Sequence, residues 1–211
     1  MQKPFFFCLT ILTLCIFLLA AGGCGVSTKP SSFYTLSPIV NSEMETSIPK
    51  TGQGMAIGVG PVKFPRYLER SQIVIRTGQN SIELAEFHRW AGSLKKDFLL
   101  ILAENLSILL STDRVFLYPW RKSVPIDYQV AVEVFQLDGR PGENALLVAC
   151  WNIFSGDGKK EFLSKKSSFK EPAGAEGYNA FVAAESRALA NLSRDIAAAI
   201  KAISARNSSG S

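Results

Sequence analysis

Hydrophobic residues through much of the chain recur with the two-residue period of β-strands. Ile73 and Ile75 alternate with polar neighbours before a turn at 78–80, and the alternation resumes after it, which predicts a hairpin. Segments rich in glycine, proline and polar residues separate this hairpin from other β-prone runs. The expected β-regions are 33–36, 55–65, the hairpin 72–87, 114–120, and a three-stranded meander over 127–171.

Two further segments carry apolar residues at steps of three and four, the spacing of one helix face. The first covers 90–110, and the second, which is rich in alanine, covers 176–205. Strands precede and follow the first helix, and the second helix closes the chain. This order predicts an α+β fold, a single domain with a mainly antiparallel sheet and two principal helices packed on it.

The start of the chain has a different character. Lys3 precedes an almost wholly apolar run over 5–21, and small residues lead up to Cys24, the arrangement of a secretory signal. Residues 21–24, Ala-Gly-Gly-Cys, resemble a bacterial lipobox, in which the cysteine receives diacylglycerol before cleavage, although leucine is usual in place of Ala21. We therefore expect a lipoprotein signal peptide over 1–23 and lipidation of Cys24. The alternative is an ordinary secreted or membrane-spanning start.

The mature chain then divides into a short tether over 24–32, a domain over 33–205 and a disordered tail over 206–211. Position two of the mature chain is Gly25 rather than aspartate, which resembles the enterobacterial rule for export to the outer membrane. We expect the domain to face the periplasm, held by acyl chains that bury many methylene groups in the bilayer.

Composition narrows the function further. The formal net charge of +5 falls to +4 when Lys3 is removed with the signal, and no basic cluster interleaved with aromatic residues suggests nucleic acid. With Cys24 lipidated and the two signal cysteines removed, only Cys150 remains, so no intramolecular disulfide is expected. Cys150 lies in an apolar strand-like run, which favours a buried and unreactive thiol.

The sequence lacks the usual signs of catalysis. His88 is the only histidine, so no pair of histidines can bind zinc, and we expect it to cap or lie at the surface. Gly58-Val59-Gly60 is followed by Pro61 rather than a helix, which excludes a dinucleotide loop. No Gly-x-Ser-x-Gly elbow is present. We expect no enzyme activity, cofactor or metal, and solvated carboxylates at Glu83, Glu86 and Glu133.

Several short motifs follow one another in order over residues 33–120. Together they resemble the PqiC family, the ABC-type transport auxiliary lipoproteins, and the similarity is weaker in the meander and the last helix. The motifs are Phe33-Tyr34-Thr35-Leu36, Val59-Gly60-Pro61-Val62, Pro65-x-Tyr67-Leu68-x-Arg70, Gln72-Ile73-Val74, Glu86-x-x-Arg89-Trp90, Glu104-Asn105-Leu106 and Tyr118-Pro119-Trp120.

The resemblance implies an outer-membrane lipoprotein that works with an MCE-domain protein (PqiB-like) anchored in the inner membrane. Assemblies of MCE proteins form hollow tubes that carry lipids between the membranes. The lipoprotein is then expected to receive the far end of the tube, as an adaptor rather than a catalyst. A homo-oligomeric ring of subunits is a further implication of the resemblance.

The segment 65–70, Pro-Arg-Tyr-Leu-Glu-Arg, is the candidate contact with that partner. Arg66 and Arg70 flank Tyr67 and Leu68, a composition typical of interface anchors. The alternative is that Tyr67 and Leu68 cap the core while the arginines are solvated.

Two other functions stay open from the sequence. The chain could be a structural or assembly lipoprotein of the outer membrane that has no transport partner. It could also be a tethered hydrolase that uses scattered acids, which would require a clustered acidic cleft with shifted pKa values.

Overall fold

The computed structural model describes residues 29–39, 54–121 and 123–209. The chain divides into two compact units, Met1–Pro30 and Ser31–Ser211, and the second contains every described strand and helix. The expected signal peptide and Cys24 lie outside the described residues. Within the described part of the chain, no helix is both long and apolar enough to cross a membrane.

The predicted meander is confirmed as the three longest strands of the sheet. They are β6 (Tyr128–Arg140), β7 (Asn144–Ser155) and β8 (Glu161–Pro172), and both pairings are antiparallel. Along β7, buried Ala145, Leu147, Ala149, Trp151 and Ile153 alternate with less buried residues, so this strand has one core face.

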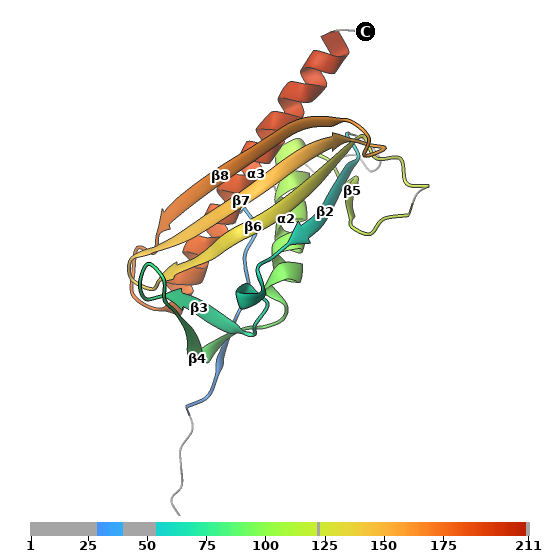
Figure 1. The fold of residues 1–211 in the computed structure, drawn as a ribbon. Coiled ribbons are helices and arrows are strands. Elements are labelled where there is room, and N and C mark those ends of the chain that lie inside the picture. Colours follow the sequence, from blue (N-terminus) through green and yellow to red (C-terminus); the bar gives the residue numbers. More distant parts are fainter. Residues whose placement is uncertain (1–28, 40–53, 122, 210–211) are drawn as a thin grey trace, which may run out of the picture. The chain divides into compact units, whose positions relative to one another are not determined.

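Five shorter strands complete one open sheet of eight (Figure 1). The other edge of β6 is shared, because β2 pairs with its first half and β3 meets it at Gly139. The predicted hairpin is confirmed as β3 and β4, and the sheet is mainly antiparallel as expected. The pairings of β2 with β5 and β6, of β1 with β4 and of β3 with β6 are parallel. The shorter strands are β1 (Ser32–Tyr34), β2 (Ile57–Lys63), β3 (Gln72–Arg76), β4 (Ile82–Trp90) and β5 (Val115–Leu117).

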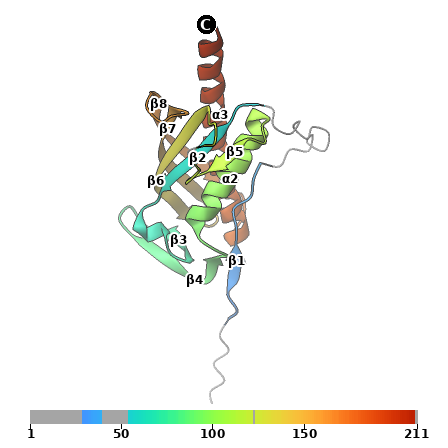
Figure 2. The ribbon, with the colours of Figure 1, turned by 90° about the vertical axis from the view of Figure 1, so that its right-hand side faces the viewer.

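Two helices cover one face of this sheet and leave the other face open (Figures 1 and 2). They are α2 (Leu94–Leu110) and α3 (Tyr178–Ser209), which confirms the two principal helices. The predicted start of the first helix is wrong: Trp90 is the last residue of β4, and its N–H donates to Ser71 O at 2.7 Å. Trp90 is buried and faces the core, so its position in the apolar pattern fits either element. The second helix continues past the expected end at 205.

After β1, residues 35–39 cross the two helices as an irregular strap. The N–H of Leu36 donates to Asp97 Oδ2 of α2 at 2.7 Å, and the N–H of Ser37 donates to Ser186 Oγ of α3 at 3.1 Å. The N–H of Ile39 donates to Asn105 Oδ1 at 2.8 Å. Side chains of the helices therefore supply the hydrogen bonds that an irregular segment lacks, and the strap holds the end of β1 against both helices.

Candidate partner-docking surface

Large apolar side chains that remain exposed gather in two places among the described residues. Leu117 of β5 and Tyr118, which follows β5, form the first group, and Leu100 lies separately on α2. Phe33, Ile82 and Leu84 on β1 and β4 form the second, and Phe135 lies apart on β6. Apolar groups of this kind on a folded surface commonly mark contacts with proteins or membranes.

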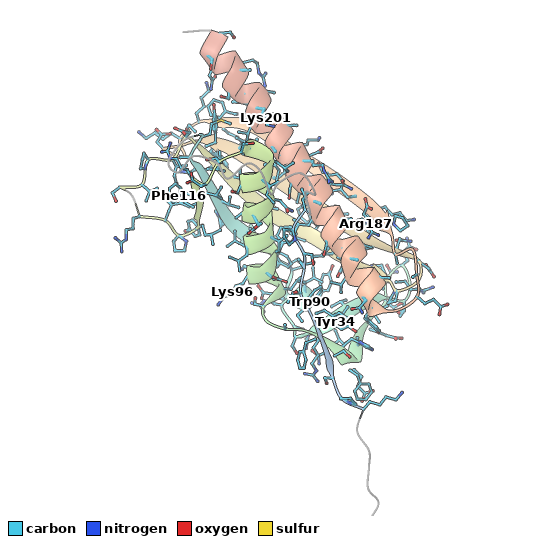
Figure 3. All side chains as sticks on the ribbon, turned by 180° about the vertical axis from the view of Figure 1, so that it is seen from behind. Tyr34, Trp90, Lys96, Phe116, Arg187 and Lys201 are labelled. Atoms are coloured by element: carbon cyan, nitrogen blue, oxygen red, sulfur yellow. The ribbon has the colours of Figure 1, made fainter. Side chains whose placement is uncertain are left out.

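The first group borders a groove of about 370 Å³ between β2, the start of α2 and the segment after β5. Its apolar lining is Pro61, Val62, Leu99 and Tyr118. Ser93, Lys95 and Lys96 complete the lining, and Figure 3 shows Lys96 near the N-terminal end of α2. The groove therefore combines apolar walls with two ammonium groups, a surface suited to an apolar segment that carries negative charge.

Tyr118 is held in place by β2 and by a neighbouring ring. Its N–H donates to Val59 O at 2.9 Å, which continues the parallel pairing of β2 with β5. Its ring meets that of Trp120 edge to face, with centroids 5.4 Å apart. The side chain of Tyr118 remains 50% exposed, so a fixed aromatic ring faces solvent at the edge of the groove.

Two glycines of β2 make room for these rings. A Cβ atom on Gly60 would lie 2.6 Å from Tyr118 Cβ, and one on Gly58 would lie 2.9 Å from a ring carbon of Trp120. Gly60 also has a φ of +114°, a conformation that favours glycine. The Val59–Val62 and Tyr118–Trp120 motifs, far apart in sequence, are thus two sides of one structural unit.

The predicted contact segment lies in a short 3₁₀ turn, Arg66–Leu68, that follows β2. Leu68 is only 2% exposed and belongs to the core, whereas Arg66 and Arg70 are exposed. Tyr67 is partly buried, and its hydroxyl donates to Asp138 Oδ2 at 3.1 Å. Burial and the nearby Asp138 carboxylate raise the pKa of Tyr67 to about 12. The arginines are therefore the members of this segment that a partner can reach.

Asp138 anchors this turn from inside the fold. The carboxylate is completely buried, and Arg76 donates to it from Nε at 2.9 Å and from a terminal nitrogen at 2.8 Å. Gln136 adds a third donor at 2.7 Å. A buried carboxylate needs such partners because its desolvation is costly, so Tyr67 belongs to a structural network.

The turn and the groove are neighbours on the same side of the fold. Lys95 Nζ of the groove lies 3.7 Å from Glu69 Oε1 of the predicted segment, and both side chains are well exposed. We call the combined area, formed by Arg66, Arg70, Lys95, Leu99 and Tyr118, the docking surface. Its arginines belong to the contact segment predicted from the sequence. The groove was not predicted, although the Tyr118–Trp120 motif was a usable signal.

The polar residues considered for catalysis have structural partners or are exposed. Tyr34 Oη lies 2.8 Å from His88 Nδ1, and the His88 ring stacks on Tyr178 with centroids 3.6 Å apart, so His88 ties β4 to β1 and α3. Glu83 and Glu86 are exposed. In the described part of the chain, no group of three or more His, Cys, Asp or Glu residues is arranged to hold a metal ion.

Glu185 of α3 is a buried titratable group that was not predicted from the sequence to be of interest. It is buried in the core, and its Oε2 has no hydrogen-bond partner within the described structure. Desolvation, with a smaller contribution from the Asp138 carboxylate, raises the pKa of Glu185 well above its ordinary value. The docking surface includes no part of this side chain.

Comparisons with known proteins agree with the motif order. Residues 34–197 match the family described as ABC-type transport auxiliary lipoprotein component. A crystal structure of an uncharacterized protein is 19% identical, with a TM-score of 0.66, covering 82% of this chain and 99% of that one. A Xanthomonas campestris protein assigned to the DUF330 family is 14% identical, with a TM-score of 0.65, covering 85% and 100%. No curated protein matches the chain.

Proposed function

The chain belongs to the ABC-type transport auxiliary lipoprotein components, and on that basis we propose that it docks an MCE-type lipid transport assembly at the outer membrane. In this role a lipid at Cys24 holds the domain at the periplasmic face of the membrane. The docking surface receives the end of a periplasmic MCE tube. The protein acts as an adaptor and not as an enzyme.

The exposed group around Tyr118 is the observation that carries this proposal. A fixed aromatic ring exposed at the edge of an apolar groove is a common feature of contacts with other molecules. Aromatic residues and arginine are also the residue types that most often contribute binding energy at interfaces. Leu117 and Tyr118 are exposed, and Arg66 and Arg70 extend the same side of the molecule.

The positive charge around the docking surface indicates which side chains a partner surface would carry. Lys95, Lys96, Arg66 and Arg70 border the docking surface, and Glu69 is the acid paired with Lys95. A complementary partner surface would carry apolar side chains flanked by Asp or Glu, which speeds association and fixes orientation. A homo-oligomeric ring would place several copies of the docking surface around one tube end.

Co-purification of the lipoprotein with its MCE partner tests the proposal. Tyr118→Ser should reduce recovery of the partner, because it removes exposed apolar area from the docking surface without opening the core. Phe135→Ser is the matched control, since Phe135 is similarly exposed at 46% on β6 and is not one of the residues that form the docking surface. Both variants should remain folded.

The same experiment separates the alternatives. If the partner is lost equally in Phe135→Ser, or is absent from the parent complex, the docking assignment is wrong. Crosslinks from Arg66 and Arg70 positions to an outer-membrane barrel, with none to an MCE protein, would instead favour an assembly lipoprotein without a transport partner.

A further inference from the structure

The second exposed apolar group lies at one end of the folded unit, on β1 and β4. These two strands form an outer edge of the sheet, at the end opposite the C-terminal end of α3 (Figures 1 and 2). Phe33 is 64% exposed, the most exposed large apolar side chain of the described residues, and Ile82 and Leu84 are 39% and 40% exposed. The proposed docking contacts use none of these side chains.

We propose that this edge rests on the bilayer in which the acyl chains of Cys24 are embedded. The inference rests on the proposed lipidation of Cys24 and adds which surface of the domain meets the lipid. Phe33 lies nine positions after Cys24, so even a fully extended tether holds Phe33 within about 30 Å of the anchored residue. For comparison, the 32 residues of α3 span about 48 Å.

The pairing of β1 places Phe33 on the side facing away from the helices. Tyr34 turns toward α3, since its ring lies 6.2 Å from that of Tyr178. Successive side chains of a strand point to opposite sides, so Phe33 faces the other way. Arg89 is the register partner of Phe33 on β4 and shares its side. Arg89 is only partly exposed and its Nε is buried, so Phe33 is the side chain of this pair that reaches the surface, where an aromatic ring is typical of the headgroup level of a membrane.

The charges of β4 limit how deep the contact goes. Glu83 and Glu86 are exposed on the same strand as Ile82 and Leu84. Carboxylates are strongly disfavoured in the hydrocarbon core, so the edge lies among headgroups rather than in the acyl region. The contact is then driven by apolar side chains at the surface and does not require anionic lipid.

Site-specific photocrosslinking in the lipidated full-length protein tests this contact. Benzoylphenylalanine replaces Phe33, Leu84 or, as the control, Phe135, in protein reconstituted into phosphatidylethanolamine–phosphatidylcholine vesicles that contain a radiolabelled phospholipid. Positions 33 and 84 should give several-fold more labelled adduct than position 135, because all three are exposed but only the first two lie on the β1–β4 edge.

Fatty-acid labelling of the same samples distinguishes failure of the membrane contact from failure of the Cys24 anchor. Equal adduct yields at positions 33, 84 and 135 in acylated protein would overturn the membrane contact and leave the anchor intact. Crosslinks from positions 33 and 84 to protein in place of lipid would also overturn it. Absence of fatty acid on Cys24 would overturn the proposed anchor, and the membrane contact with it.

Discussion

Replacing Asn105 with alanine should weaken the attachment of the strap and destabilise the whole domain. The Asn105 side chain is completely buried. It accepts a hydrogen bond from the N–H of Ile39 at 2.8 Å and donates one to Ser193 Oγ at 3.1 Å. It thus connects α2, α3 and the strap at one point.

The loss of stability follows from the hydrogen bonds that Ile39 and Ser193 lose when the Asn105 side chain is removed. Without Asn105 the partly buried N–H of Ile39 loses its acceptor, and leaving such a donor unsatisfied costs about 1–3 kcal/mol. Ser193 still donates to Leu189 O at 2.8 Å, so its loss is limited to one net hydrogen bond of about 1 kcal/mol. Asn105→Ala should therefore lower the free energy of unfolding by about 2–4 kcal/mol.

Urea denaturation measures this change, and hydrogen exchange of the Ile39 amide reports on the strap directly. Asn152→Ala is the control, because Asn152 donates to Ser164 Oγ at 2.8 Å on an exposed part of the sheet. It should change stability by no more than about 0.5 kcal/mol. A comparably small effect of Asn105→Ala, with protection of Ile39 unchanged, would refute the role assigned to this side chain.

Three further predictions concern the groove, the core and the anchor. Gly60→Ala should cost about 2–4 kcal/mol by urea denaturation, because its positive φ is strained and the new methyl group would meet Tyr118; a neutral effect would contradict the close packing of β2 and Tyr118. The raised pKa of Glu185 means that the folded protein retains a proton that the unfolded chain releases. Stability should therefore fall as pH rises above about 4.3, and Glu185→Gln should reduce that fall when urea midpoints are compared from pH 4 to 8; parallel pH curves would be contrary evidence. Cys24→Ala should abolish fatty-acid labelling and release the domain from the membrane fraction, and retained label would show that another residue is modified.

The local periods of the sequence were sufficient for most of the fold. The outer bounds of the meander, 127–171, were predicted within a residue of those observed, because β6 alternates apolar and polar residues, β7 is a strand-length apolar run, and glycine-containing turns separate the strands. Trp90 was assigned to the helix, although it ends β4. It lies close to the boundary between β4 and α2, where a single apolar residue fits both the two-residue period of a strand and the three-to-four-residue period of a helix. The parallel pairings of β2 with β5 and β6 were not predicted, because no short-range pattern specifies a partner distant in sequence.

The candidate contact segment 65–70 also shows that a local pattern does not predict which side chains are exposed. Its composition indicated an interface, yet Leu68 packs in the core and Tyr67 bonds to the buried Asp138, while Arg66 and Arg70 are exposed. Composition gives the kinds of side chain present. Which of them face solvent depends on the 3₁₀ turn and on the neighbouring strand.

The sequence by itself determined the α+β class, the two apolar helix faces and the family, because these depend on local period and on motif order. Tertiary structure alone decided that the Val59–Val62 and Tyr118–Trp120 motifs meet to form a groove and that the strap crosses both helices. Such contacts join residues far apart in the chain. They form only when burial of a shared core outweighs the entropy lost in bringing those segments together.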